Sequence, residues 1–188
     1  MKTEDRKEIT NKEAKAGVTK AKSNAAAGLT ELFEDGLKDI YWAEKALIKA
    51  IPLMAKNATS ADLIEALNSH LTETEDQIIR LEKVFELIDK KASAKKCDAM
   101  EGLIEEGKGI LEETELGVVR DAGIIAASQK IEHYEIASYG TLRQFAETLG
   151  LEEAAALLEE TLDEEKGADK KLTDVAVNAV NFDAAEAE

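Results

Sequence analysis

The chain has 188 residues, which suits one domain with a buried core, and its formal net charge of -16 at pH 7 argues against nucleic-acid binding by the acidic body. Ala, Leu, Glu and Lys dominate, with one proline and few aromatic residues, which favours helices over sheets. One cysteine excludes an internal disulfide, and no apolar run is long enough to span a membrane or to act as a secretion signal, so we expect a cytoplasmic protein.

The beginning of the chain differs from the rest in charge. Residues 1–22 hold seven Lys and Arg against four Asp and Glu, a charge of +3, so the remaining 166 residues carry -19. We expect residues 1–28 to form a basic, disordered and solvated arm. Its charge also permits the alternative that the arm binds an anionic partner.

Two long helices are expected first. The first runs from about Thr30, a possible cap, to Asn57, and Pro52 predicts a kink or local break in it. The second begins at a cap formed by Thr59 or Ser60 and ends in the lysine-rich residues 90–96, where cations suit a helix C-terminus. The apolar spacing that defines both helices is carried by Leu37, Ile40, Leu47, Ile51, Leu63, Leu67, Leu71, Ile78, Leu81 and Phe85.

A long connection, residues 90–119, separates these helices from the last two. It contains a short amphipathic helix at about residues 99–113, and we expect Cys97, a lone loop thiol beside two lysines that could lower its pKa, to be inert. The remaining long helices are expected at about residues 119–149 and 151–177, separated by Gly150. Residues 179–188 are small and acidic and are expected to fray.

Connection lengths predict the topology. Short turns join the first helix to the second and the third to the fourth, so each pair forms an antiparallel hairpin. The middle connection is long enough to return along the helices. These features predict an all-α, ferritin-like four-helix bundle at residues 29–178, with a long crossover that contains a short extra helix.

Acidic residues lie at the centres of the apolar stripes, where burying an unpaired carboxylate costs several kcal/mol. Glu44 lies seven residues from both Leu37 and Ile51, so all three face the core. Glu135 and Glu165 have the same seven-residue spacing to leucines of their own helices. Glu132 and Asp169 lie one turn from Glu135 and Glu165, and the second helix adds His70 and Glu73. The candidate metal ligands are therefore Glu44, His70, Glu73, Glu132, Glu135, Glu165 and Asp169.

Carboxylates gathered at one depth repel each other unless cations lie among them, so the pattern predicts two metal ions. Oxygen ligands with one imidazole suit iron, or manganese, better than zinc or copper. Glu164 and Glu165 are adjacent and cannot both face the centre. The apolar stripe of the helix favours Glu165. Comparison with the second helix favours Glu164, because Glu164 precedes Leu172 by the same interval as Glu73 precedes Leu81. We take Glu165 as the ligand.

Other side chains near these acids have simpler roles. His133 points away from Glu135 and is expected at the surface or an interface. Tyr41 lies one turn before Glu44 and could hydrogen-bond a ligand, whereas Tyr134 and Tyr139 lie on other faces; core packing is the simpler role for all three. Trp42 is expected at a helix–helix or subunit contact.

Four segments resemble the bacterial YciE/YciF ferritin-like stress proteins. They are LKDIYWAEKAL at residues 37–47, MEGLIEE at 100–106, QKIEHYEIASYG at 129–140, and TLDEEK at 161–166 followed by Asp169 and Leu172. The resemblance covers residues 30–178 and implies a ferritin-like bundle, a dinuclear metal centre and an association with stress, but it supplies no reaction. The basic arm is an addition to the family pattern.

The sequence departs from wider ferritin-like proteins, which use one Glu plus a Glu-x-x-His motif in each half. Here the third helix has Glu132-x-x-Glu135, similar to rubrerythrins, and the second has His70-x-x-Glu73 in reversed order.

Three functions remain open on the sequence alone. The first is a di-iron oxidoreductase that reduces peroxide or oxygen, or oxidises Fe(II). The second is a metal-binding or iron-handling protein without turnover. The third is an interaction module in which the acids form buried ion pairs without metal. A homodimer is expected.

Overall fold

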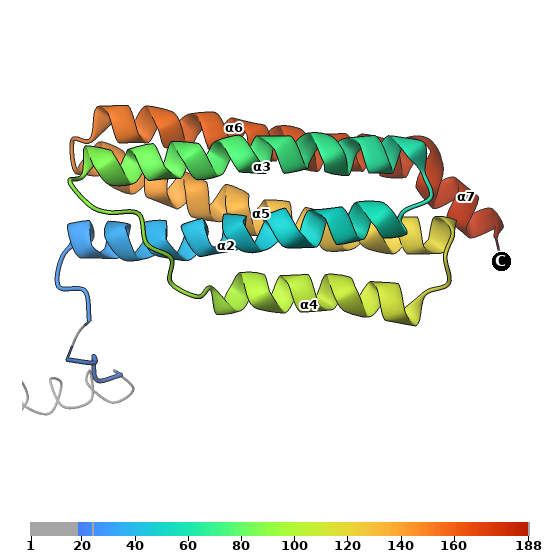
Figure 1. The fold of residues 1–188 in the computed structure, drawn as a ribbon, viewed down its shortest axis with the longest axis horizontal. Coiled ribbons are helices and arrows are strands. Elements are labelled where there is room, and N and C mark those ends of the chain that lie inside the picture. The colour runs from blue at the N-terminus through green and yellow to red at the C-terminus, as the bar shows by residue number, and fades with distance from the viewer. Residues whose placement is uncertain (1–18, 24, 188) are drawn as a thin grey trace, which may run out of the picture.

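The computed structural model describes residues 19–23 and 25–187, so most of the expected basic arm lies outside the described residues. Within the described part the fold is all-helical and contains no strand (Figure 1). Five main helices are followed by a short π-helical turn and a terminal helix: α2 (Leu29–Asn57), α3 (Ala61–Leu87), α4 (Asp98–Glu113), α5 (Val118–Thr148), α6 (Glu152–Val175), η1 (Ala176–Val180) and α7 (Asn181–Glu186).

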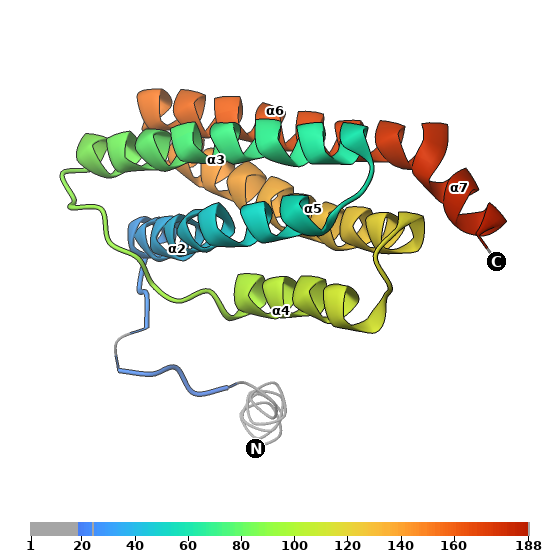
Figure 2. The same ribbon diagram turned by 45° about the vertical axis from the view of Figure 1, so that its right-hand side comes forward.

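The four longest helices lie side by side around a shared core. Each packs against two others: α2 against α3 and α5, and α6 against α5 and α3. Sequential neighbours run antiparallel, and α4 carries the chain back along the molecule between the end of α3 and the start of α5 (Figure 1). Helix α4 lies outside this group, against α5 and α2, as the turned view shows (Figure 2).

The ends of α2 and α3 are fixed by local hydrogen bonds. Gly28, rather than Thr30, precedes α2, and its backbone N–H donates to Oε2 of Glu31 at 2.6 Å. Ser60 caps α3 by accepting a hydrogen bond from the N–H of Leu63, one of the two capping residues predicted. The break expected at Pro52 does not occur, because α2 continues through it to Asn57.

Asp121, at the start of α5, holds the α2–α3 turn in place. Its carboxylate is fully buried and accepts hydrogen bonds from the backbone N–H groups of Thr59 and Ser60, each at 2.8 Å, and from the hydroxyl of Thr59 at 2.6 Å. These bonds satisfy a buried charge without a cation. Sequence reasoning missed this residue because its partners lie about 60 positions away.

The last described residues pack against the rest of the chain. The chain continues in helical form to Glu186 through η1 and α7, and Val180 is 2 % exposed. Helix α7 packs against α5. Helical structure therefore extends past residue 179, where fraying was expected to begin, and Val180 supplies an apolar anchor beyond the end of α6.

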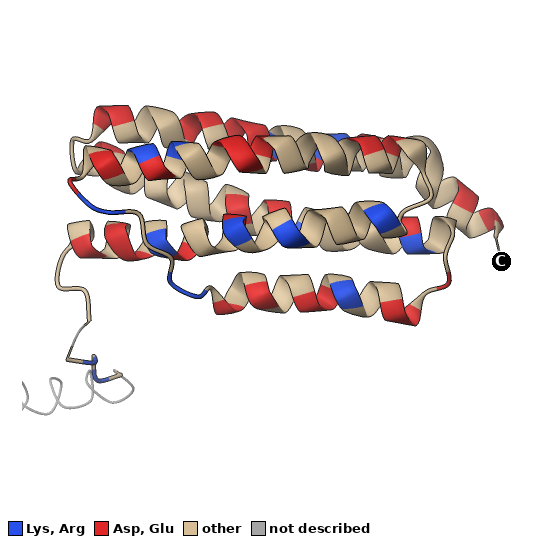
Figure 3. Ribbon diagram, in the orientation of Figure 1, with Lys and Arg blue, Asp and Glu red and all other residues tan. Residues whose placement is uncertain are grey.

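Basic residues gather in the connection between α3 and α4 (Figure 3). Lys90 pairs with Glu34 at 2.9 Å and Lys95 with Asp35 at 3.1 Å, which ties the connection to α2. Trp42 of α2 is half-buried, packs against the core and lines a pocket together with residues of α4. In the described part of the chain, no helix combines the length and the apolar character needed to cross a membrane.

Candidate metal centre

Each of the four longest helices places an ionisable side chain at the same depth in the core. Glu44 comes from α2, His70 from α3, Glu132 and Glu135 from α5, and Glu165 from α6. All are buried, the most exposed being His70 at 6 %. Their positions follow from helical periodicity, because each replaces an apolar residue in a stripe that faces the other helices.

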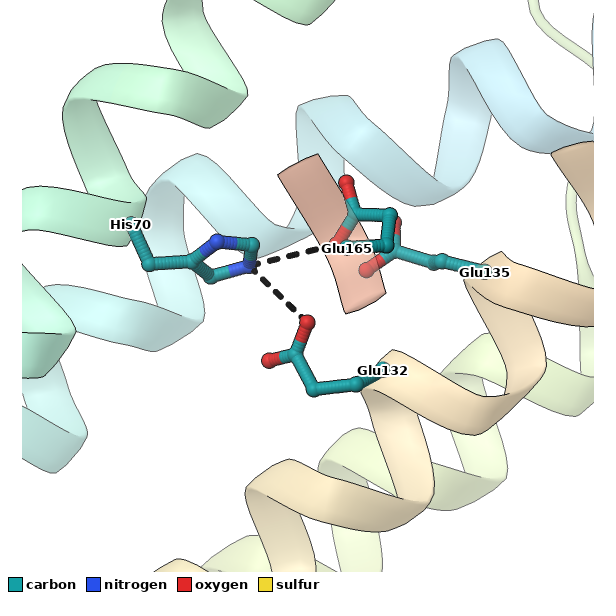
Figure 4. Close-up of side chains that lie close together, drawn as sticks. All are labelled: His70, Glu132, Glu135 and Glu165. Atoms are coloured by element: carbon teal, nitrogen blue, oxygen red, sulfur yellow. Dashed lines mark ion pairs between the residues drawn. The ribbon is translucent and has the colours of Figure 1, made fainter. Parts of the chain in front are cut away.

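Four of these residues form a compact group, His70, Glu132, Glu135 and Glu165, called the cluster below. One ligand atom from each lies within 4.8 Å of the ligand atoms of the other three. Nε2 of His70 is 3.5 Å from Oε2 of Glu132 and 3.9 Å from Oε2 of Glu165. Figure 4 shows the imidazole pointing toward the three carboxylates, so the side chains converge on one point.

The cluster is rich in buried polar atoms that have no hydrogen-bond partner. A hydrogen-bond partner is missing for both carboxylate oxygens of Glu135 and of Glu165, for Oε2 of Glu132 and for both ring nitrogens of His70. It is also missing for Oε2 of Glu44. Most buried polar atoms in proteins are satisfied, and each exception calls for an explanation. Six carboxylate oxygens and two imidazole nitrogens left free at one site form a set of donors suited to metal.

Glu44 is linked to the cluster through charge and to Tyr139 through a hydrogen bond. The hydroxyl of Tyr139, which is fully buried, donates to Oε1 of Glu44. The expectation that Tyr139 lies on another face is therefore wrong. Tyr139 follows Glu135 by four residues, one helical turn, and that spacing was the signal in the sequence that could have placed it.

The electrostatics of the carboxylates favour protonation when no cation is present. Burial raises the pKa of Glu44 to about 8, aided by the charge of Glu165 and opposed by the Tyr139 hydrogen bond. Burial also raises the pKa values of Glu132 and Glu135 well above the usual range and raises that of Glu165. Metal must therefore compete with protons for these oxygens.

The histidine responds in the opposite sense to its surroundings. Burial favours neutral His70, but the nearby carboxylates, Glu132 foremost, outweigh burial and raise the pKa of His70 to about 10. The surrounding carboxylates therefore favour the cationic form of the imidazole, and the same charges would favour a bound cation.

Besides Glu44, two more of the seven candidate ligands lie outside the cluster. Oε2 of Glu73 is 3.5 Å from Nδ1 of His70, but its side chain is 41 % exposed. Asp169 is not brought to the centre: its Oδ1 lies 3.3 Å from Nε2 of His133 and accepts from the amide of Gln129 at 3.0 Å. His133 is exposed, as expected.

The structure distinguishes Glu164 from Glu165. Glu165 is fully buried in the cluster, whereas Glu164 faces Arg80, whose guanidinium donates to both carboxylate oxygens at 2.9 Å. Gln77 also donates to Glu164, at 3.1 Å. The apolar stripe was therefore the better guide to which residue faces inward.

The remaining singled-out side chains form separate contacts. Tyr41 donates to Glu82 at 2.7 Å instead of to a candidate ligand. Cys97 is buried, with its sulfur 3.0 Å from the hydroxyl of Tyr134, which donates to Asp39. Burial raises the pKa of the Cys97 thiol, so the neighbouring lysines do not activate it.

Two pockets reach the cluster from different sides. One, of about 280 Å³, lies between α3 and α6 and ends on His70 and Glu132. The other is narrow, about 20 Å³, and is lined mainly by apolar residues of α2, α3 and α5, together with the same His70 and Glu132. His70 and Glu132 therefore line both pockets.

Comparison with known proteins gives a consistent family assignment. The model of the family described as "Domain of unknown function (DUF892)" matches residues 28–185. Protein YciF of Escherichia coli strain K12 is 51 % identical over 154 residues, which cover 81 % of this chain and 93 % of the relative.

Solved structures agree with the assignment. The crystal structure of the E. coli stress protein YciF has a TM-score of 0.80 at 50 % identity and covers 83 % of this chain and 99 % of its own. YcfI from Rhodopseudomonas palustris has a TM-score of 0.79 at 43 % identity and covers 81 % of this chain and 98 % of its own. The chain therefore belongs to the DUF892 family and is a homologue of the stress protein YciF.

Proposed function

We propose that the protein is a ferritin-like four-helix bundle that binds two metal ions, most readily iron, and reacts there with peroxide or oxygen. The observation that carries the proposal is the convergence on one point of buried carboxylate oxygens and imidazole nitrogens that have no hydrogen-bond partner. Manganese is the alternative metal, because oxygen ligands suit it as well.

The number of ions follows from charge. Glu44, Glu132, Glu135 and Glu165 carry four negative charges when ionised, and two divalent ions carry four positive charges. Full neutralisation matters because an uncompensated buried charge destabilises a protein by several kcal/mol. A mononuclear site would leave two of these carboxylates unmatched or protonated.

Five residues would form the ligand set. Glu132, Glu135, Glu165 and His70 would hold the metal, and Glu44, fixed by Tyr139, would complete the ligand set from α2. Iron bound there would supply one electron per ion, so that two Fe(II), one hydrogen peroxide and two protons would give two Fe(III) and two water molecules.

The alternative of a metal-independent interaction module is less well supported. In that case buried acids should be satisfied by partners, as Asp121 is by Thr59 and Ser60. Within the cluster, His70 is an ion-pair partner for Glu132 and Glu165, but both oxygens of Glu135 have no hydrogen-bond partner. Gln77 and Arg80 of α3 pair with Glu164 instead.

A single-turnover experiment tests the proposal. Protein loaded anaerobically with Fe(II) is mixed with hydrogen peroxide, and Fe(III) formation and peroxide loss are followed together. We expect bound iron to oxidise faster than free Fe(II), with about one peroxide consumed for two irons. Bound iron that oxidises no faster than iron in buffer would instead assign the chain to metal binding without turnover.

A further inference from the structure

The pocket between α3 and α6 is lined by side chains that range from exposed to buried, and the buried ones belong to the cluster. At its outer rim lie Glu73, with a side chain 41 % exposed, and Lys171, which is also exposed. At its inner end lie His70 and Glu132, which are 6 % and 2 % exposed. The rest of the lining combines small side chains such as Ser69, two leucines, and Glu164, which is paired with Arg80.

The imidazole of His70 lies between an outer and an inner carboxylate. Its Nδ1 is 3.5 Å from Oε2 of Glu73, and its Nε2 is 3.5 Å from Oε2 of Glu132. Neither ring nitrogen has a hydrogen-bond partner, although the ring is almost fully buried. Three potential ligands therefore follow one another from solvent to core, each within reach of the next.

The second pocket is unsuited to ions. Its volume of about 20 Å³ is close to that of one water molecule, and its lining includes Leu47, Ile51 and Met54. A divalent ion would have to lose most of its hydration shell there without replacement ligands, which is strongly unfavourable.

We propose that Glu73 captures divalent cations at the rim of the α3–α6 pocket, from which they pass by way of His70 to the cluster. This inference rests on the proposed metal site and gives Glu73 a role in the rate of loading instead of in the final ligand set. Lys171 opposes the same step, because its positive charge lies at the same rim.

Mn(II) is a suitable probe, because the electron paramagnetic resonance signal of the free ion is lost on binding and the ion is not oxidised. Metal-free protein is mixed rapidly with Mn(II), and both the rate and the final stoichiometry are recorded. We expect Glu73→Gln to slow loading about tenfold without changing the stoichiometry, and Lys171→Gln to accelerate it about twofold.

Two matched controls carry the same charge changes on the same helices. Glu75→Gln on α3 and Lys170→Gln on α6 alter exposed residues that do not line the pocket. We expect both to load at the wild-type rate. The rate of the wild type should also fall with added salt more than that of Glu73→Gln.

The outcomes separate the two proposals. A Glu73→Gln rate equal to the wild-type rate would overturn the entry route, and a loss of bound Mn(II) at saturation would overturn it by making Glu73 a permanent ligand. If the wild-type protein takes up no Mn(II) at all, the metal site itself is wrong, and the entry route fails with it.

Discussion

Glu44, Glu135 and Glu165 could be assigned to the core from sequence because each occupies a position seven residues from an apolar residue on the same helical face. Asp169 lies one turn after Glu165, but the structure leaves it at the edge of the core, where exposed His133 is its partner. A one-dimensional spacing does not show where a neighbouring helix stops covering a face, so the edge of the stripe could not be located.

Hydrogen bonds between side chains on different helices were harder to predict. Tyr139 and Glu44 are 95 residues apart, as are Tyr134 and Asp39. No local rule links such positions, and only the packing of α2 against α5 brings them together.

The Tyr139→Phe variant tests whether the hydrogen bond from Tyr139 keeps Glu44 ionised for metal binding. The hydroxyl of Tyr139 is the hydrogen-bond donor to Glu44, and its bond lowers the pKa of that carboxyl. Its removal should favour the protonated form, so that metal binds about 10- to 100-fold more weakly. The measurement is a competition titration of Mn(II) at several pH values, in which the defect should grow as the pH falls.

Tyr41→Phe provides the matched control for that titration. Tyr41 of α2 is also buried, with its ring against Phe85 of α3, but its hydroxyl bonds to Glu82, outside the cluster. An equal loss of affinity in both variants would mean that Tyr139 acts through general stability and not through Glu44.

Among the helices, the four long ones were the easiest to predict, because sustained apolar periodicity defined them and short turns fixed their pairing. Helix α4 was located almost to the residue, but its mode of packing was not. At Gly123 of α5, an added Cβ would lie 2.5 Å from Cγ2 of Ile110 of α4, so the two helices approach closely at that point.

A double-mutant cycle tests this close approach. Gly123→Ala should destabilise the protein by about 1 kcal/mol or more, because the new methyl group overlaps Ile110 and outweighs the gain in helix propensity. In an Ile110→Ala background the same change should become neutral or stabilising. The measurement is urea-induced unfolding of all four proteins of the cycle.

Gly109→Ala supplies the comparison within α4. An added Cβ there meets no atom within 4 Å, so only the helix propensity changes and the stability should rise by up to about 1 kcal/mol. If Gly123→Ala is stabilising in the wild-type background as well, the close contact between α4 and α5 is not a constraint on this fold.

At the scale of the whole molecule, buried acids conflict with folding unless protons or cations neutralise them. The pKa of Glu44 is raised to about 8 and that of His70 to about 10, and burial raises those of the remaining cluster acids. Every one of these groups holds its proton more tightly in the folded chain than in the unfolded chain.

The metal-free protein should therefore lose stability as the pH rises. For Glu44 the loss begins above its usual pKa of 4.5 and is complete near 8; for His70 it runs from 6.5 to about 10. Each proton held only by the folded state contributes about 1.4 kcal/mol per pH unit. Urea unfolding from about pH 5 to about pH 9 measures the slope.

The Glu135→Gln variant and metal loading are the controls for this slope. Gln keeps the shape of the side chain but cannot ionise, so the variant should lose less stability over the same pH range. Added metal should stabilise the wild type more at high pH, because the ligands must be deprotonated. Stability that rises with pH in the metal-free protein would contradict the protonation states inferred for the cluster.

The homodimer stays a prediction, as does an anionic partner for the basic arm, whose residues 1–18 lie outside the described part of the chain.

Metal content tests the central claim most directly. Tag-free protein is loaded anaerobically with Fe(II), freed of excess ion and analysed by elemental mass spectrometry, together with Glu135→Ala. We predict about two irons per chain in the wild type and their loss in the variant. Fewer than about 0.2 metal ions per wild-type chain, after loading with either Fe(II) or Mn(II), would contradict the metal centre and the functions built on it.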